Sequence, residues 1–166
     1  MKRKIVAGGV AVVALVALSL VVASAAAKPD FSGKWVMDKA KSEGLPPNMD
    51  QTMTITQTGD KIELETKITT PNGERVIKDS YTADGKEADF TPQGPQGAMG
   101  KGKRTTKWSA DGAALEVSET ATLDGAGEVS ATRKWSLAAD GKTLTVELNF
   151  SGEQGMQKTK RVFVKQ

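Results

Sequence analysis

From residue 50 onward the chain alternates between apolar and polar residues in short runs, such as Met53-Thr54-Ile55-Thr56 and Leu144-Thr145-Val146-Glu147-Leu148. A period of two is typical of a strand with one buried and one exposed face. The dipeptides between the runs tolerate the positive φ angles of tight hairpin loops, which predicts an antiparallel meander. They are Gly59-Asp60, Asn72-Gly73, Asp84-Gly85, Asp111-Gly112, Asp124-Gly125 and Asp140-Gly141.

Hairpin registers make this prediction specific. In a two-residue hairpin, facing residues have a constant index sum and share one face of the sheet. Applied to five of the turns, this rule places the apolar residues on one common face, and the Asp124 loop needs three or five residues to stay in phase. The predicted pairs include Ile55 with Leu64, Leu64 with Tyr81, Tyr81 with Ala88, Trp108 with Leu115, and Trp135 with Val146.

A meander of about eight to ten strands with one apolar face needs closure or a second sheet to bury that face. The short connections favour an up-and-down barrel over a Greek-key sandwich, and closure also removes exposed strand edges. A short helical turn between Asp38 and Glu43 is the only helical element that the pattern predicts after the N-terminal segment. We therefore expect an all-β fold, with residues 28–166 forming one antiparallel barrel.

Gly33-Lys34-Trp35 opens the first predicted strand, and Arg161 lies near the last one. These features resemble the lipocalins and the wider calycin superfamily, whose first strand begins with a G-x-W motif. In that family the tryptophan lies at the closed end of the barrel, and a basic residue from near the last strand crosses it. The resemblance implies that Gly33, Trp35 and Arg161 close the barrel, and that the barrel forms a cup for a small apolar or amphipathic molecule.

Residues 1–27 have the three parts of an export signal. A basic start precedes an apolar run over residues 5–22, and small residues then suit a signal peptidase, with cleavage after Ala27 or Ala25. The alternative is an uncleaved anchor, because about 18 apolar residues approach the shortest bilayer span. We expect a secreted or periplasmic protein with no membrane span once this segment is removed.

Composition narrows the function classes. The 166 residues include no cysteine and no histidine, which excludes disulfides, thiolate zinc sites, cysteine nucleophiles and Ser-His arrangements. Removing Lys2, Arg3 and Lys4 from the 23 basic residues leaves 20, against 20 acidic ones. This balance gives no support for a nucleic-acid partner. We expect no metal, no cofactor and no enzymatic activity.

The predicted inner face carries charged residues among its aromatic ones. The register places Arg104 opposite Glu119, and it places Arg133 opposite or diagonal to Glu119, depending on the Asp124 loop. These residues and Asp79 form a purely structural ion cluster in one interpretation. In the other, a spare positive charge binds the carboxylate or phosphate of a ligand. The candidate ligand-binding residues are Asp79, Tyr81, Arg104, Trp108, Glu119, Arg133 and Trp135.

Two functions follow from these expectations. In the first, the barrel binds a small hydrophobic or amphipathic ligand, and Arg104 or Arg133 contacts its anionic end. In the second, the protein is a non-enzymatic structural or interaction protein of the cell envelope. A lumen plugged by Trp108, Trp135 and Phe150 would indicate the second function.

Overall fold

The computed structural model describes residues 28–92, 99–125 and 127–166; the predicted export signal, residues 1–27, lies outside them. The expected helical turn is the 3-10 helix η1 (Lys39–Lys41). In the described part of the chain, no helix is both long and apolar enough to cross a membrane. The described residues form ten strands: β1 (Gly33–Met37), β2 (Asp50–Thr58), β3 (Lys61–Thr70), β4 (Gly73–Thr82), β5 (Glu87–Phe90), β6 (Gly100–Trp108), β7 (Ala114–Leu123), β8 (Gly127–Leu137), β9 (Thr143–Gly152) and β10 (Gly155–Lys165).

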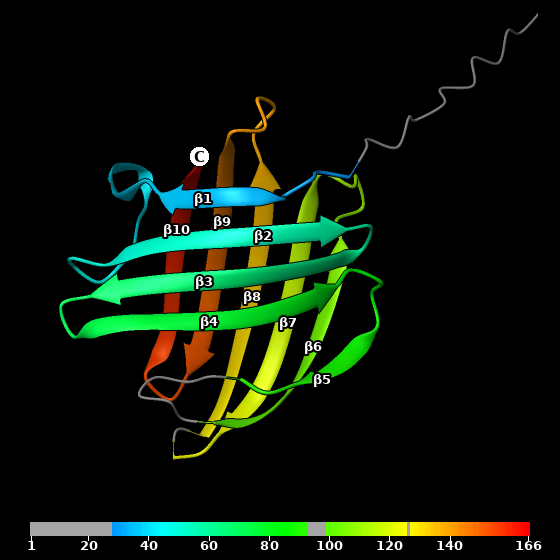
Figure 1. The fold of residues 1–166 in the computed structure, drawn as a ribbon. Helices are drawn as coiled ribbons and strands as arrows, with labels where there is room; N and C mark the ends of the chain where they lie inside the picture. Colours follow the sequence, from blue (N-terminus) through cyan, green and yellow to red (C-terminus); the bar gives the residue numbers. More distant parts are fainter. Residues whose placement is uncertain (1–27, 93–98, 126) are drawn as a thin grey trace, which may run out of the picture.

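All ten strands belong to one antiparallel sheet, in the order β4-β3-β2-β1-β10-β9-β8-β7-β6-β5. Strand β1 pairs with both β2 and β10, and so joins the first four strands to the last six. In Figure 1, β1–β4 cross in front of β6–β10 at a steep angle, so the sheet is curled around one face. The prediction of an all-β, up-and-down fold is confirmed.

Aromatic side chains fill one end of the curled sheet, which we call the closed end. Phe31 is fully buried. Its ring stacks on that of Trp108 with a centroid distance of 6.0 Å, and it meets the ring of Trp135 edge-on at 5.9 Å. Tyr81 contacts Trp135 edge-on, also at 5.9 Å. Such offset and edge-on ring pairs stabilise a core beyond the area that they bury.

Most of the predicted registers are confirmed. Strand β2 buries alternate residues, as the sequence pattern requires. Leu123 pairs with Gly127, so the Asp124 loop has three residues, one of the two predicted lengths. The confirmed pairs are Ile55 with Leu64, Trp108 with Leu115, Arg104 with Glu119, and Trp135 with Val146.

The predicted pairing of Tyr81 with Leu64 is wrong, because Tyr81 faces Ile62. Thr70 pairs with Gly73, so the loop consists of residues 71 and 72. Residue 71 is a proline, which lacks an N–H and has a fixed φ that suits the first position of a turn. The loop thus lies one residue earlier than predicted, which displaces the pairing of β3 with β4 by two residues. An even displacement leaves every side chain on its predicted face.

The predicted hairpin at Asp84-Gly85, which would pair Tyr81 with Ala88, is also wrong. Strands β4 and β5 are the two edges of the sheet, and Ala88 pairs with Arg104 of β6. The Gly85 N–H donates to the Thr106 carbonyl of β6 at 2.9 Å, so this turn is held by β6 and not by β4. The barrel is therefore open along a line between β4 and β5, which we call the seam.

The Phe31→Ala substitution tests the closed end. Phe31 contacts two tryptophan rings and is fully buried, so we expect the free energy of unfolding to fall by about 3–5 kcal/mol. Urea denaturation followed by tryptophan fluorescence measures this change. Val76→Ala is the control, because Val76 is 47% exposed, and we expect it to change stability by no more than about 0.5 kcal/mol. Equal effects of the two substitutions would contradict the packing described here.

Candidate functional site

Five charged side chains lie inside the barrel next to the closed end; we call them the charged layer. Each comes from a different strand, at an inward position of the alternating pattern. Three guanidinium groups and two carboxylates leave one positive charge in excess. The members are Asp79 of β4, Arg104 of β6, Glu119 of β7, Arg133 of β8 and Arg161 of β10.

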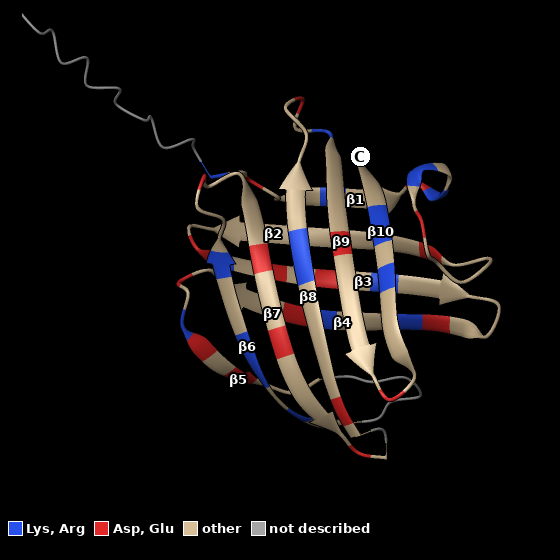
Figure 2. Cartoon of the chain, turned by 180° about the vertical axis from the view of Figure 1, so that it is seen from behind, with Lys and Arg blue, Asp and Glu red and all other residues tan. Residues whose placement is uncertain are grey.

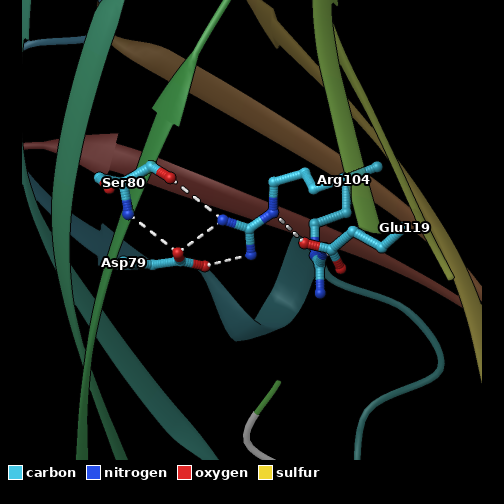
Figure 3. A network of polar contacts seen from close by, with 5 residues as sticks. Asp79, Ser80, Arg104 and Glu119 are labelled. Carbon is cyan, nitrogen blue, oxygen red and sulfur yellow. Dashed lines mark hydrogen bonds and ion pairs between the residues drawn. The ribbon is translucent and has the colours of Figure 1, made fainter. Parts of the chain in front are cut away.

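Arg104 is the most fully bonded member of the charged layer (Figure 3). Its Nε donates to Glu119 Oε1 at 2.6 Å. Its Nη1 and Nη2 donate to the two carboxylate oxygens of Asp79 at 2.7 and 2.9 Å, and Nη1 also donates to the Ser80 carbonyl at 3.0 Å. Four of its five N–H donors are therefore taken by protein acceptors, which favours the structural interpretation for this residue.

The surroundings of Arg104 stabilise its charge further. Its guanidinium lies over the Tyr81 ring at 4.5 Å and over the Phe90 ring at 4.2 Å, a favourable cation–π arrangement. Burial lowers the pKa of Arg104, but the hydrogen bonds to Asp79 and the nearby negative charges outweigh burial, so the pKa lies above its ordinary value. Burial also raises the pKa of the Tyr81 hydroxyl, which therefore stays neutral.

Arg133 shares Glu119 with Arg104. Its Nη1 forms a short ion pair with Glu119 Oε2. Glu119 pairs directly with Ala131 in the sheet, so the contact with Arg133 is diagonal, as the three-residue loop requires. The buried Glu119 carboxylate therefore pairs with two guanidinium groups, whereas the Asp79 carboxylate pairs with Arg104.

Arg161 is left as the unneutralised cation. Among the described residues, the hydrogen-bond partner of its side chain is the neutral Gln51, whose Oε1 accepts from Nη1 at 3.0 Å. The buried Nε of Arg161 has no acceptor within the described ranges. Burial, and then the like charge of Arg133, lower the pKa of Arg161. A lowered pKa means that the protein disfavours this charge, so an anion placed beside it would be bound favourably.

A second unpartnered donor lies near Arg161. In the described part of the chain, the buried Trp135 Nε1 has no hydrogen-bond partner. Trp135 and Arg161 both pair with Val146, from opposite sides, so they share one row of the sheet two strands apart. Neighbouring strands are about 4.8 Å apart, which puts the two backbones about 10 Å from each other.

Two cavities meet at the charged layer. The small cavity, of about 130 Å³, adjoins the closed end, and the large cavity, of about 280 Å³, lies on the other side. Ile77, Asp79 and Arg133 line both. The small cavity is lined in addition by Gln51, Tyr81, Trp135 and Arg161, and the large one by Phe90, Leu123, Val129, Ala131 and Phe150, among others.

The candidate aromatic residues do not all reach this site. Tyr81 and Trp135 line the small cavity. Trp108 lines neither cavity: it packs on Phe31, and its Nε1 donates to Asp60 at 3.0 Å. Phe150 lines the large cavity. The interior is therefore filled at the closed end and hollow beyond the charged layer.

Basic and acidic residues alternate between neighbouring strands. Figure 2, which colours the ribbon and so includes the inward residues of the charged layer, shows basic bands on β6, β8 and β10 beside acidic bands on β5, β7 and β9. Exposed ion pairs join neighbouring strands, for example Lys103 with Asp89 at 2.7 Å and Lys107 with Glu116 at 3.7 Å. Such exposed pairs contribute little to stability, so the charge excess inside the barrel is the distinctive electrostatic feature.

No protein-family model matches the sequence, and no curated protein matches it either. Solved structures do match. Zebrafish ileal bile acid-binding protein in complex with cholic acid superposes with a TM-score of 0.54, at 20% identity over 82% of this chain and 98% of that one. The fold is calycin-like. Secretory abundant heat soluble protein 4 from Ramazzottius varieornatus has a TM-score of 0.52, at 14% identity over 84% of this chain and 96% of that one.

The G-x-W motif lies at the closed end of this calycin-like barrel, but the basic residue across it is not the expected Arg161. Lys165 pairs with Trp35 in the sheet, and its Nζ lies 5.3 Å from the centre of the Trp35 ring. Arg161 lies four residues earlier on β10, about 13 Å along the strand, and donates to Gln51. A Cβ at Gly33 would come within 2.6 Å of Lys165 Cε, so glycine gives this side chain room to reach the tryptophan.

The family resemblance implied a different role for Arg161, that of the basic residue across Trp35. The alternation on β10 could have placed it, because Arg161 and the buried Phe163 are two residues apart and so share the inner face. No local sequence pattern predicts that Arg161 has no carboxylate partner among the described residues. The absence of a partner depends on which residues of β2 and β8 lie across the barrel from Arg161.

Two substitutions test the charge assignment. We expect Arg161→Met to leave the free energy of unfolding within about 1 kcal/mol of the wild-type value or to raise it, because it removes a half-buried charge that lacks a counter-ion. Glu119→Gln deprives two guanidinium groups of their shared carboxylate, and we expect it to cost about 3–5 kcal/mol. Urea denaturation of the purified protein measures both. A larger loss for Arg161→Met than for Glu119→Gln would contradict the assignment.

Proposed function

We propose that the protein is exported and binds a small amphipathic anion inside its calycin-like barrel. The negatively charged group of the ligand lies between Arg133 and Arg161, and its apolar part occupies the large cavity. The observation that carries this proposal is the unneutralised guanidinium of Arg161. The zebrafish neighbour, a bile acid-binding protein in complex with cholic acid, supports a small ligand inside this fold.

The charged layer carries an electrostatic cost when no ligand is bound. A charge withdrawn from water without a counter-ion is costly, and the half-buried Arg161 bears part of this cost in the unliganded protein. A ligand carboxylate or phosphate would provide the missing charge, and the planar guanidinium suits such groups. The buried Trp135 Nε1 offers a further donor at the same cavity.

The remaining volume limits the size of the ligand. The large cavity, about 280 Å³, is near the lower end of the range of about 300–1,000 Å³ that is typical of ligand pockets. Its wall combines apolar side chains from β7, β8 and β9 with the charged layer at one end. This combination suits a compact molecule or a short apolar chain with one anionic end.

The alternative, a non-enzymatic envelope protein with a filled barrel, draws its support from the closed end, where Phe31, Trp108 and Trp135 pack together. A fully structural barrel has no need of an excess charge beside two cavities. We therefore favour ligand binding over a purely structural role.

Binding of decanoate and of decanol by the same protein tests the proposal. We expect decanoate to bind more tightly than decanol. Arg161→Met should weaken decanoate binding about tenfold or more, or about 1.4 kcal/mol, and change decanol binding far less, because only the anion uses the guanidinium. Isothermal titration calorimetry gives the affinities, and quenching of Trp135 fluorescence reports occupancy of the small cavity.

Lys158→Met is the matched control for this experiment. Lys158 lies on β10 like Arg161 and has the same charge, but it is exposed on the outer face. We expect it to leave both affinities nearly unchanged. Equal weakening by the two substitutions would attribute binding to surface charge, and the absence of decanoate binding would overturn the proposed function.

Export has its own test. We expect the protein isolated from the cells that produce it to lie outside the cytoplasm and to begin at Lys28, or at Ala26 if cleavage follows Ala25. Intact-mass spectrometry of the fractionated protein measures this. The full-length mass in a membrane fraction would instead indicate an uncleaved anchor.

A further inference from the structure

The seam separates the large cavity from an outer groove by a single layer of side chains. The groove has a volume of about 1020 Å³ and is lined by residues of β2–β6 and of the segment between β4 and β5. The residues that line both the groove and the large cavity are Lys78, Asp79, Phe90, Thr91 and Arg104. Moving this group of side chains aside would connect the cavity to the groove.

Side chains take the place of backbone pairing at the centre of the seam. Strands β4 and β5 share no ladder. The Ser80 N–H of β4 donates to Asp79 Oδ1 at 2.8 Å, and the Ser80 carbonyl accepts from Arg104 at 3.0 Å. Both backbone groups of this edge residue are therefore satisfied by side chains, and Arg104 reaches them from β6.

The two ends of Arg104 differ in how easily they can be released. Its Nε donates to Glu119, which is 7% exposed and belongs to the neighbouring strand β7. Its Nη atoms bind Asp79, whose side chain is 29% exposed at the groove. Water can replace contacts to a partly exposed carboxylate far more easily than contacts to a buried one. The guanidinium can therefore release Asp79 while Glu119 holds it in place.

We propose that the Asp79–Arg104 contact is a latch, and that ligands enter the large cavity through the seam when it opens. The proposal rests on the proposed function for the identity of the molecules that enter. Access through the seam itself can be measured without any ligand. A failure of decanoate to bind and a failure of the latch to gate access are therefore separate results.

An interior thiol measures this access, because the chain has no cysteine of its own. Ala131→Cys places one thiol in the wall of the large cavity, at a residue that is 7% exposed. Val117→Cys places one in the closed end, at a residue that is 1% exposed, where labelling requires wider unfolding. The probe is a small methanethiosulfonate reagent that carries a sulfonate group, and mass spectrometry follows the labelling rate.

We expect Asp79→Asn to raise the labelling rate of the Ala131→Cys thiol about tenfold, the factor produced by about 1.4 kcal/mol of lost closing free energy. The rate for the Val117→Cys thiol should rise much less. Equal acceleration of both thiols, or acceleration of neither, would overturn the latch, because the first indicates general destabilisation and the second indicates another route.

Asp89→Asn is the matched control. Asp89 lines the same groove and undergoes the same chemical change, but its ion pair with Lys103 joins β5 to β6 and does not cross the seam. We expect it to leave the labelling rate unchanged; an acceleration equal to that of Asp79→Asn would count against the latch. Arg104→Lys is a second test if Asp79→Asn does not fold. It keeps the charge but loses the two-pronged contact with Asp79, so the same selective acceleration is expected.

Discussion

The guanidinium of Arg104 joins two parts of the sheet that no backbone ladder joins. It links β6 to the Asp79 carboxylate and the Ser80 carbonyl of β4. Glu119 accepts from its Nε, and two aromatic rings lie against the guanidinium. The curled shape of the sheet brings its two edges near each other, and this contact bridges them. The closed end, the charged layer and the cavities all depend on the curl that Arg104 helps to maintain.

The same layer explains why the interior is not simply a filled core. Glu119 and Asp79 neutralise two guanidinium groups, and the third, Arg161, is left with a neutral amide partner. A core selected for stability alone would replace such a group with an apolar side chain, which is often neutral or stabilising. The excess charge and the cavities on both sides of it are the features on which the proposal of an anionic ligand rests.

Much of the fold could be predicted because the relevant signals are local. Alternation placed the inward residues of β2–β4 and β6–β9 correctly, and the dipeptides Gly59-Asp60, Asp111-Gly112 and Asp140-Gly141 gave the correct facing pairs on either side of them. The loop beside Pro71 displaced one register by two residues, yet no side chain changed face. The segment at Asp84-Gly85 was misassigned because a turn dipeptide indicates a bend in the chain and not which strand lies beyond it.

The sequence by itself determined which side chains point inward, including Arg104, Glu119 and Arg133, since inward and outward positions follow from a period of two along each strand. Tertiary structure alone decided that β4 and β5 stay unpaired, that Lys165 and not Arg161 covers Trp35, and that Arg161 lacks a counter-ion. These outcomes depend on which residues of distant strands meet after the sheet curls. The physical reason is that charge neutralisation and edge pairing are long-range properties, whereas alternation is a property of neighbouring residues.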